Sequence, residues 1–137
     1  MSDGMFGAIT TSGTGLHVFK TWMDAVAENV ANINDVTSTS QPAFQARYVI
    51  AQNNPATSDG VGSGASVAGI AYGDAKGLEV SDPTNPLADA QGLVKRPNID
   101  IGDQLTQLML AERGYQANLA VVQRAQEAYK AALTIGQ

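Results

Sequence analysis

Asp24 and Glu28 lie four residues apart, the spacing at which two carboxylates share one face of a helix and could exchange protons with a substrate. Lys20 precedes Asp24 by four residues, so a solvent-exposed stripe of ion pairs is the simpler interpretation. His17 is the only histidine, and one histidine cannot build a metal site of several imidazoles. Because it lies two positions from the apolar Phe19, we expect His17 to face solvent.

The segment 60–66, Gly-Val-Gly-Ser-Gly-Ala-Ser, is the other candidate for chemistry, because glycine-rich loops can hold phosphate groups. Its spacing matches neither GxGxxG nor GxxxxGK[ST], and no lysine follows it directly. Ser66 fails the nucleophile-elbow pattern, since Ala68 occupies the position that requires glycine. The segment therefore predicts a flexible hairpin loop. We expect no catalytic, cofactor-binding or metal-binding residue, no cofactor and no enzymatic activity.

Composition narrows the class of protein further. The 137 residues fit one domain, and the net charge of -5 is spread along the chain without a block of like charges. Among eight basic residues only Lys95 and Arg96 are adjacent, which argues against a nucleic-acid-binding surface. There are no cysteines, so disulfides and thiolate metal sites are excluded. No apolar run approaches ~20 residues and no cleavable signal pattern opens the chain, so we expect neither membrane insertion nor signal cleavage.

Two long segments with apolar residues three and four positions apart predict the elements that dominate the fold. The first runs from Met5 to about Asn34, although the residues from 10 to 15 are weak helix formers and should fray in a lone subunit. The second starts near Pro97, with Asn98 or Asp100 as N-cap, and runs to about Ile135 before Gly136. The seam residues, which repeat at this spacing, are Leu16, Phe19, Met23, Val26, Val30 and Ile33 in the first and Leu105, Leu108, Tyr115, Leu119, Val122, Tyr129 and Leu133 in the second.

The middle of the chain favours short strands. Residues 44–50 alternate apolar and polar side chains, residues 67–72 form a second candidate strand, and residues 78–80 a third. The stretch 52–65 predicts a turn or loop. The stretch 82–97 contains three prolines and should be extended and irregular.

We therefore predict a mainly α fold with a small β insert. The terminal helices pair as an antiparallel coiled coil, so that the seam residues of the second helix meet the first helix. The expected parts are an N-terminal assembly helix (1–35), a β-rich and extended middle (36–97) and a C-terminal assembly helix (98–137). A second stripe of small residues on the last helix, Ala111, Ala125 and Ala132, would admit close neighbours.

Asparagines are an unusual feature of the two helical segments, because asparagine is unfavourable inside a helix. Asn29, Asn32 and Asn118 either are exposed or form hydrogen bonds across helix interfaces that determine register, as a buried polar residue does in a coiled coil. The spacing alone leaves both interpretations open.

The same asparagines belong to a segment that resembles a known family. Residues 27–32, Ala-Glu-Asn-Val-Ala-Asn, are similar to the N-terminal signature of the flagellar rod and hook axial proteins. Four motifs further along resemble basal-body rod members of that family: Asn-Pro-Leu-Ala-Asp-Ala at 85–90, Gly-Leu-Val at 92–94, Pro-Asn-Ile-Asp at 97–100 and Tyr-Gln-Ala-Asn at 115–118. With the first helix, the resemblance spans nearly the whole chain.

The resemblance implies a structural subunit of the proximal rod, part of a torque-transmitting drive shaft that exported subunits pass through. The implied partners are copies of the chain, other rod subunits and the flagellar type III export apparatus, and the implied location is the basal body, outside the cytoplasmic membrane. The implied assembly residues are the thirteen seam residues with Asn29, Asn32 and Asn118. The alternatives are another axial subunit of the family, or a soluble helical adaptor or export chaperone that folds on its own.

Overall fold

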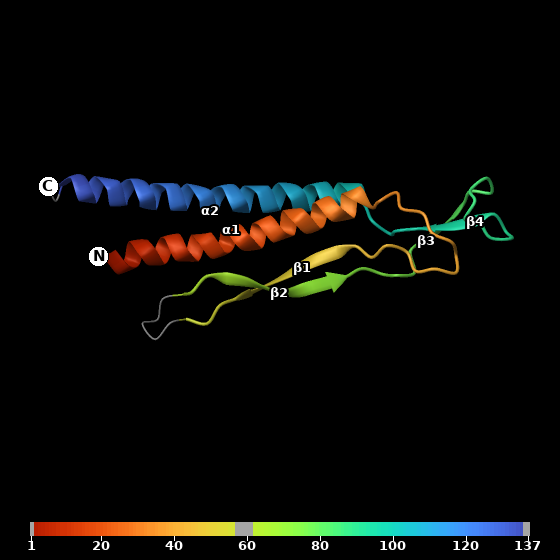
Figure 1. The fold of residues 1–137 in the computed structure, drawn as a ribbon, viewed down its shortest axis with the longest axis horizontal. Coiled ribbons are helices and arrows are strands. Elements are labelled where there is room, and N and C mark those ends of the chain that lie inside the picture. Colours follow the sequence, from red (N-terminus) through yellow and green to blue (C-terminus); the bar gives the residue numbers. More distant parts are fainter. Residues whose placement is uncertain (1, 57–61, 136–137) are drawn as a thin grey trace.

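The fold is two long helices with two short β-hairpins between them in the chain (Figure 1). We analysed a computed structural model that describes residues 2–56 and 62–135. The prediction of a mainly α fold with a small β insert is confirmed. In chain order the elements are α1 (Ser2–Ala31), β1 (Arg47–Asn53), β2 (Ala65–Tyr72), β3 (Leu78–Ser81), β4 (Leu93–Arg96) and α2 (Ile101–Ile135).

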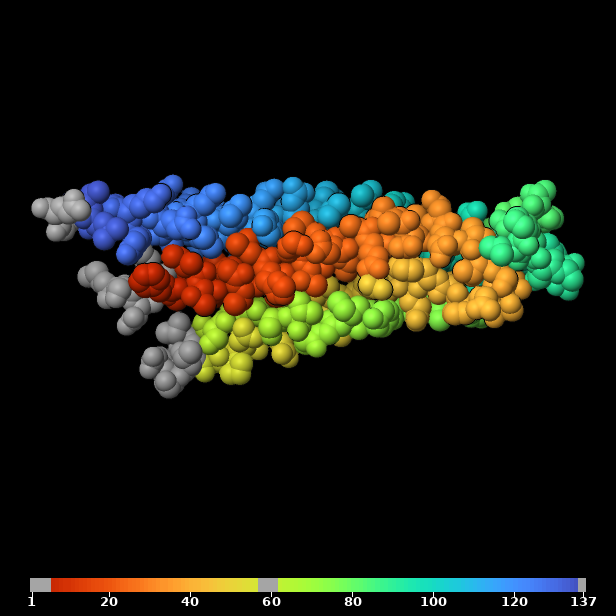
Figure 2. Space-filling model, in the orientation of Figure 1, coloured from red at the N-terminus to blue at the C-terminus, as the bar shows by residue number. Residues whose placement is uncertain are grey.

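Helix α1 is the central element of an elongated molecule (Figures 1 and 2). Helix α2 lies along one side of it, and the β1–β2 hairpin lies along the opposite side. The helices are antiparallel: the rings of Phe6 and Tyr129 are 5.8 Å apart near one end, and Asn29 is hydrogen-bonded to Gln104 near the other. Thus α1 begins and α2 ends at the same end of the molecule, while β3 and β4 lie at the far end.

The weak helix formers between residues 10 and 15 are helical in the structure because both neighbours of α1 contact them. The Thr14 hydroxyl donates to the carbonyl of Thr11 at 2.6 Å and accepts from the backbone N–H of Ala65, the first residue of β2, at 3.1 Å. Tertiary packing therefore overrides low helix propensity here. At its other end α1 stops at Ala31, three residues before the predicted Asn34, in a turn.

The hairpins differ in detail from the strands that the sequence predicts. Strand β1 covers Arg47–Asn53 rather than 44–50, and it pairs with β2 through a β-bulge between Ile50 and Ala51. Strand β4 is a correction, since we expected the whole stretch 82–97 to be irregular. Its prolines lie outside the strand, and residues 93–96 are free to pair with β3 and, through Lys95, with Thr37.

Helix α2 begins where one of the two proposed caps predicts. The Asp100 carboxylate accepts a hydrogen bond from the backbone N–H of Asp103 at 2.9 Å, so Asp100, not Asn98, is the N-cap. The helix extends to Ile135, as predicted, and Gly136 lies outside the described residues.

Asp89 organises the loop between β3 and β4. Its Oδ1 atom accepts hydrogen bonds from the backbone N–H groups of Gln91 and Leu93, each at 2.9 Å, and its Oδ2 atom accepts one from the Thr39 hydroxyl at 2.9 Å. These bonds, the one from Leu93 foremost, lower the pKa of the Asp89 carboxyl below its ordinary value. The loop is therefore held by a carboxylate that must stay ionised.

Acid should loosen this loop in a predictable way. Because the folded-state pKa of Asp89 is lowered, its stabilisation is present above the ordinary aspartate pKa and is lost as the pH falls through the lowered value. The backbone amide of Leu93, followed by NMR, should titrate with a midpoint below that of a free aspartate. Asp89→Asn should abolish this titration, and Glu79→Gln on the neighbouring strand should not. A midpoint at or above the ordinary aspartate pKa would contradict the role of the Asp89 carboxylate in holding the loop.

Candidate assembly interface

The contact between α1 and α2 is the largest helical interface in the described structure. Phe19 of the predicted seam lies against α2, whereas Gly15, Trp22 and Asn29 contact α2 one position before the predicted Leu16, Met23 and Val30. Val26 is 1% exposed and is among the most buried side chains of the molecule. The other seam residues of this segment are half-buried: Leu16, Phe19, Met23, Val30 and Ile33. Because five of the six seam residues are only half-buried, part of their apolar surface remains available for contact with another subunit.

Two glycines bring the helices close together. A Cβ atom on Gly15 would lie 2.6 Å from the Asn118 side-chain oxygen, and one on Gly114 would overlap the ring of Phe19. Each glycine therefore receives a side chain from the opposite helix. The sequence had marked the residues around Gly15 as weak helix formers, whereas nothing in its pattern had singled out Gly114.

The α2 side of the seam requires a correction. Leu105, Leu119 and Leu133, which we expected to meet α1, are 50%, 37% and 53% exposed, whereas Gln104 and Ala111 are buried. The buried and half-buried side chains of α2 recur at alternating intervals of four and three, one residue out of phase with the predicted seam at every second position: Gln104, Leu108, Ala111, Tyr115, Asn118, Val122 and Ala125. Gln107 and the predicted Tyr129 also contact α1, through Trp22 and Phe6. The sequence pattern assigned leucines to the inner positions, whereas in the structure glutamine, alanine and asparagine occupy them.

The prediction for the small residues of α2 also needs correction. Ala111, which we expected to face neighbouring molecules, is fully buried inside the subunit, and Ala125 is half-buried. Ala132 is exposed. Leu108, Tyr115 and Val122 are half-buried on the predicted seam; these statements concern burial within one copy and leave their role between copies as a prediction.

A buried polar cluster joins α1, β1 and α2. The Asn29 side chain, 0% exposed, accepts a hydrogen bond from the backbone N–H of Arg47 at 2.7 Å and donates to the Arg47 carbonyl at 2.9 Å. Its amide thus bonds both backbone groups of the first residue of β1, as a neighbouring strand would. Asn29 also donates to the Gln104 side-chain oxygen at 2.9 Å. Here the hypothesis of a cross-helix asparagine is correct.

The other two asparagines bond to their own helices. Asn32 donates to the carbonyl of Glu28 at 2.8 Å, and Asn118 donates to the carbonyl of Gly114 at 2.8 Å. Asn118 still takes part in helix packing, because its side chain lies against Gly15. Its contribution is steric rather than a hydrogen bond to α1.

The charged residues of α1 divide between solvent and the hairpin. Lys20 and Asp24 form an exposed ion pair at 2.7 Å, as the stripe interpretation predicts, and the hydrogen bond and charge of Asp24 raise the pKa of Lys20. His17 is exposed, as expected. Glu28 instead reaches Arg47 at 2.6 Å and links α1 to the start of β1. Asp24 and Glu28 therefore have separate structural partners.

Helix α2 exposes large apolar side chains along its whole length in the single copy. The exposed large side chains along it are Ile101, Leu105, Met109, Leu110, Leu119, Val121, Tyr129, Leu133 and Ile135. Scattered exposed leucines are ordinary, but a row of this length on one helix marks an interaction surface. No group of His, Cys, Asp and Glu suited to a metal ion occurs in the described part of the chain, and no helix there has the length and hydropathy to cross a membrane.

Comparison with known proteins finds relatives over almost the full length. The family model described as "Flagellar basal body rod FlgEFG protein C-terminal" matches residues 90–135. The chain is 35% identical to "Flagellar basal-body rod protein FlgC" of Escherichia coli O6:H1 over 92% of this chain and 93% of that protein. It is 34% identical to the protein of that name from Salmonella typhimurium over the same shares, and 28% identical to the one from Borreliella burgdorferi over 98% and 99%.

Proposed function

The chain belongs to the FlgC family of flagellar basal-body rod proteins, and from that membership we propose that this structural rod subunit polymerises helically through its terminal helices. The observation that supports polymerisation is the row of exposed apolar side chains on α2. In one copy α1 already has neighbours on two sides, whereas among the helices and strands that the structure describes α2 contacts only α1. A contact between two different surfaces that does not close on itself builds a helical tube.

In this proposal the predicted assembly residues fall into two groups. Val26 and Asn29 hold the helix pair together within a subunit, while Leu105, Leu119 and Leu133 contact neighbouring subunits. Tyr129 is exposed, but its ring lies near Phe6 of α1, so we assign it to both groups. The partially buried members of the set also contribute to both: Leu16, Phe19, Met23, Val30, Asn32, Ile33, Leu108, Tyr115, Asn118 and Val122. The division follows from exposure in the single copy.

We place the subunit in the proximal rod, where it transmits torque and surrounds the passage for exported subunits. Its partners are copies of itself and other rod subunits, and it reaches the cell envelope through the flagellar type III export apparatus without signal cleavage. The role is mechanical, without catalysis or cofactor. The motif at 85–100 favours this rod subunit over other axial proteins.

Leu119→Asp tests the division between the two groups. Leu119 is 37% exposed, so a charge there should leave the helicity and export of the subunit unchanged, yet it should prevent rod assembly. Electron microscopy of envelopes from a strain lacking the gene should reveal rings without rod, hook or filament. Wild-type gene should restore complete basal bodies, and the Leu119→Asp gene should not.

His17→Asp provides the matched control, since it adds the same charge at an exposed helical position outside the predicted interface. That variant should assemble normally. Intact flagella in the deletion strain would disprove the rod function itself. Normal rods built from Leu119→Asp would instead remove Leu119 from the interface and leave the rod function standing.

A further inference from the structure

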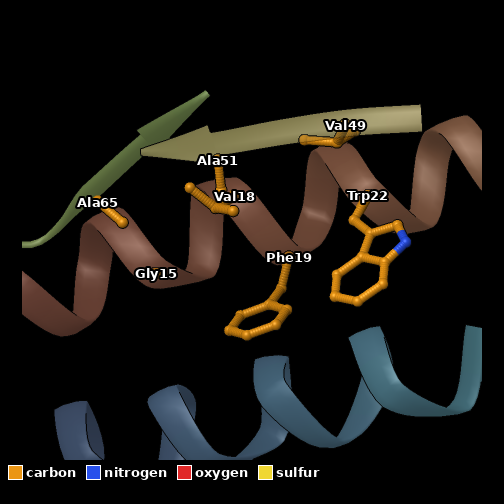
Figure 3. A pocket seen from close by; sticks show the side chains of 7 residues that line it. All are labelled: Gly15, Val18, Phe19, Trp22, Val49, Ala51 and Ala65. Carbon is orange, nitrogen blue, oxygen red and sulfur yellow. The ribbon is translucent and has the colours of Figure 1, made fainter. Parts of the chain in front are cut away.

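An apolar groove runs between α1 and the β1–β2 hairpin (Figure 3). Its volume is about 300 Å³. One wall is made by Val18, Phe19 and Trp22 of α1, and the other by Val49, Ala51 and Ala65 of the hairpin. None of these side chains carries a charge, so a charged ligand would lose its hydration without gaining a partner.

The groove is held open by contacts on its far side. Trp22 donates from Nε1 to the Gln107 side-chain oxygen on α2 at 3.2 Å, and Phe19 lies against Gly114 of the same helix. In Figure 3 both rings extend from α1 towards α2 and away from the strands. The hairpin contributes small side chains, Ala51 and Ala65, which do not fill the space. The cavity is therefore part of the packed fold.

A complementary surface exists on the same chain. Ile101, Leu105 and Met109, here called the apolar ridge, follow one another at intervals of four residues and are each about half exposed at the start of α2. Residues 104–111 contain no charged side chain. The ridge lies on a helix whose Gln104 and Ala111 are buried, so its side chains belong to the exposed part of that helix.

We propose that the apolar ridge of one copy occupies the apolar groove of the next copy. The ridge cannot fill the groove of its own chain, since α2 and the hairpin lie on opposite sides of α1 (Figure 1) and the ridge side chains remain about half exposed. Every copy carries one ridge and one groove, so each contact leaves a further ridge and a further groove available. This heterologous geometry propagates.

The identity of the occupant follows from continuity with the helix interface inside the subunit. Phe19 and Trp22 belong both to the groove and to the contact between α1 and α2. A helix entering the groove would therefore extend that contact as a third helix. This assignment rests on the proposed rod function, which requires contacts between copies, and it names the two surfaces that make one of them.

Engineered cysteines can test the pairing cleanly, because the chain has no cysteine of its own. The double variant Ala51→Cys with Met109→Cys should form covalent multimers in isolated, mildly oxidised basal bodies. Neither single variant should form dimers, since groove does not face groove. Ala51→Cys with Thr84→Cys, in the loop after β3, is the matched control and should give no multimers. Dimers of the Ala51→Cys single variant, or normal rods without multimers in the double variant, would overturn the pairing.

A second variant covers the case in which the cysteine pair prevents assembly. Ala51→Trp should fill the groove and abolish rods while leaving the helicity of the purified subunit unchanged. Gln52→Trp places the same side chain on the other face of β1 and should assemble normally. Normal rods from Ala51→Trp would overturn the proposal. That result would also be expected if the groove holds a small apolar molecule and not a second copy. The proposed rod function would be unaffected, because the deletion strain tests it separately.

Discussion

Val26→Asp should destabilise the helix pair within the subunit and abolish rod assembly, without blocking export. Val26 is 1% exposed, so the new carboxylate would lie in an apolar interior without a partner. The expected loss in the free energy of unfolding is on the order of 4 kcal/mol. Urea unfolding followed by circular dichroism gives this value, and immunoblots of secreted material report export.

Ala27→Asp is the control for this substitution. Ala27 is exposed and follows Val26 in the same helix, so the same residue there should lower the free energy of unfolding by about 1 kcal/mol or less, mainly through helix propensity. Equal destabilisation by both variants would mean that helix propensity, not burial, explains the effect. Normal assembly of Val26→Asp would disprove its place in the helix interface.

Asn29→Leu should be the second most damaging substitution. It removes three hydrogen bonds and leaves the backbone N–H and C=O of Arg47 and the Gln104 oxygen without their partner. Since each unsatisfied buried group costs ~1–3 kcal/mol, the expected loss is on the order of 3 kcal/mol or more. Gln104→Leu removes only the bond to Asn29, and should cost about 1–2 kcal/mol.

The double variant distinguishes a shared bond from independent effects. If Asn29 and Gln104 stabilise the fold through one another, the double variant should cost less than the sum of the single variants. Gln116→Leu, an exposed position on the same helix, controls for the glutamine-to-leucine change and should be nearly neutral. Strict additivity of the two single effects in urea unfolding would argue against a functional Asn29–Gln104 bond.

Hydrophobic spacing was sufficient to predict both long helices, because helices of this length repeat the signal many times. The hairpin strands carried a shorter signal, and β4 carried almost none. Lys95 and Arg96 make half of that strand polar, its partner Thr37 is distant in the chain, and the loop between Ser81 and Leu93 is longer than a tight hairpin turn. Pairing of this kind depends on the tertiary fold and has no local mark in the sequence.

The interface was only partly predictable on either helix. Helix α1 packs on two sides, so Val26 is buried, but Gly15, Trp22 and Asn29 contact α2 beside the predicted Leu16, Met23 and Val30. On α2, leucines lie on the outside as well as the inside, and hydrophobicity alone could not separate the two faces. The signal that could have done so was the alternating recurrence of Gln104, Ala111 and Asn118 among the apolar positions. Trp22 and Gly114, which shape the groove, gave no periodic signal of their own.

The central position of α1 has a consequence for when the subunit becomes complete. Both of its packing partners follow it in the chain, and its bonds to α2 join residues 75 and 85 positions apart. Such distant contacts close late. While α2 is still held in a ribosome or a narrow conduit, α1 lacks the helix that it packs against. Release of the last helix and completion of the fold are then a single event, and competence to bind another copy begins at that moment.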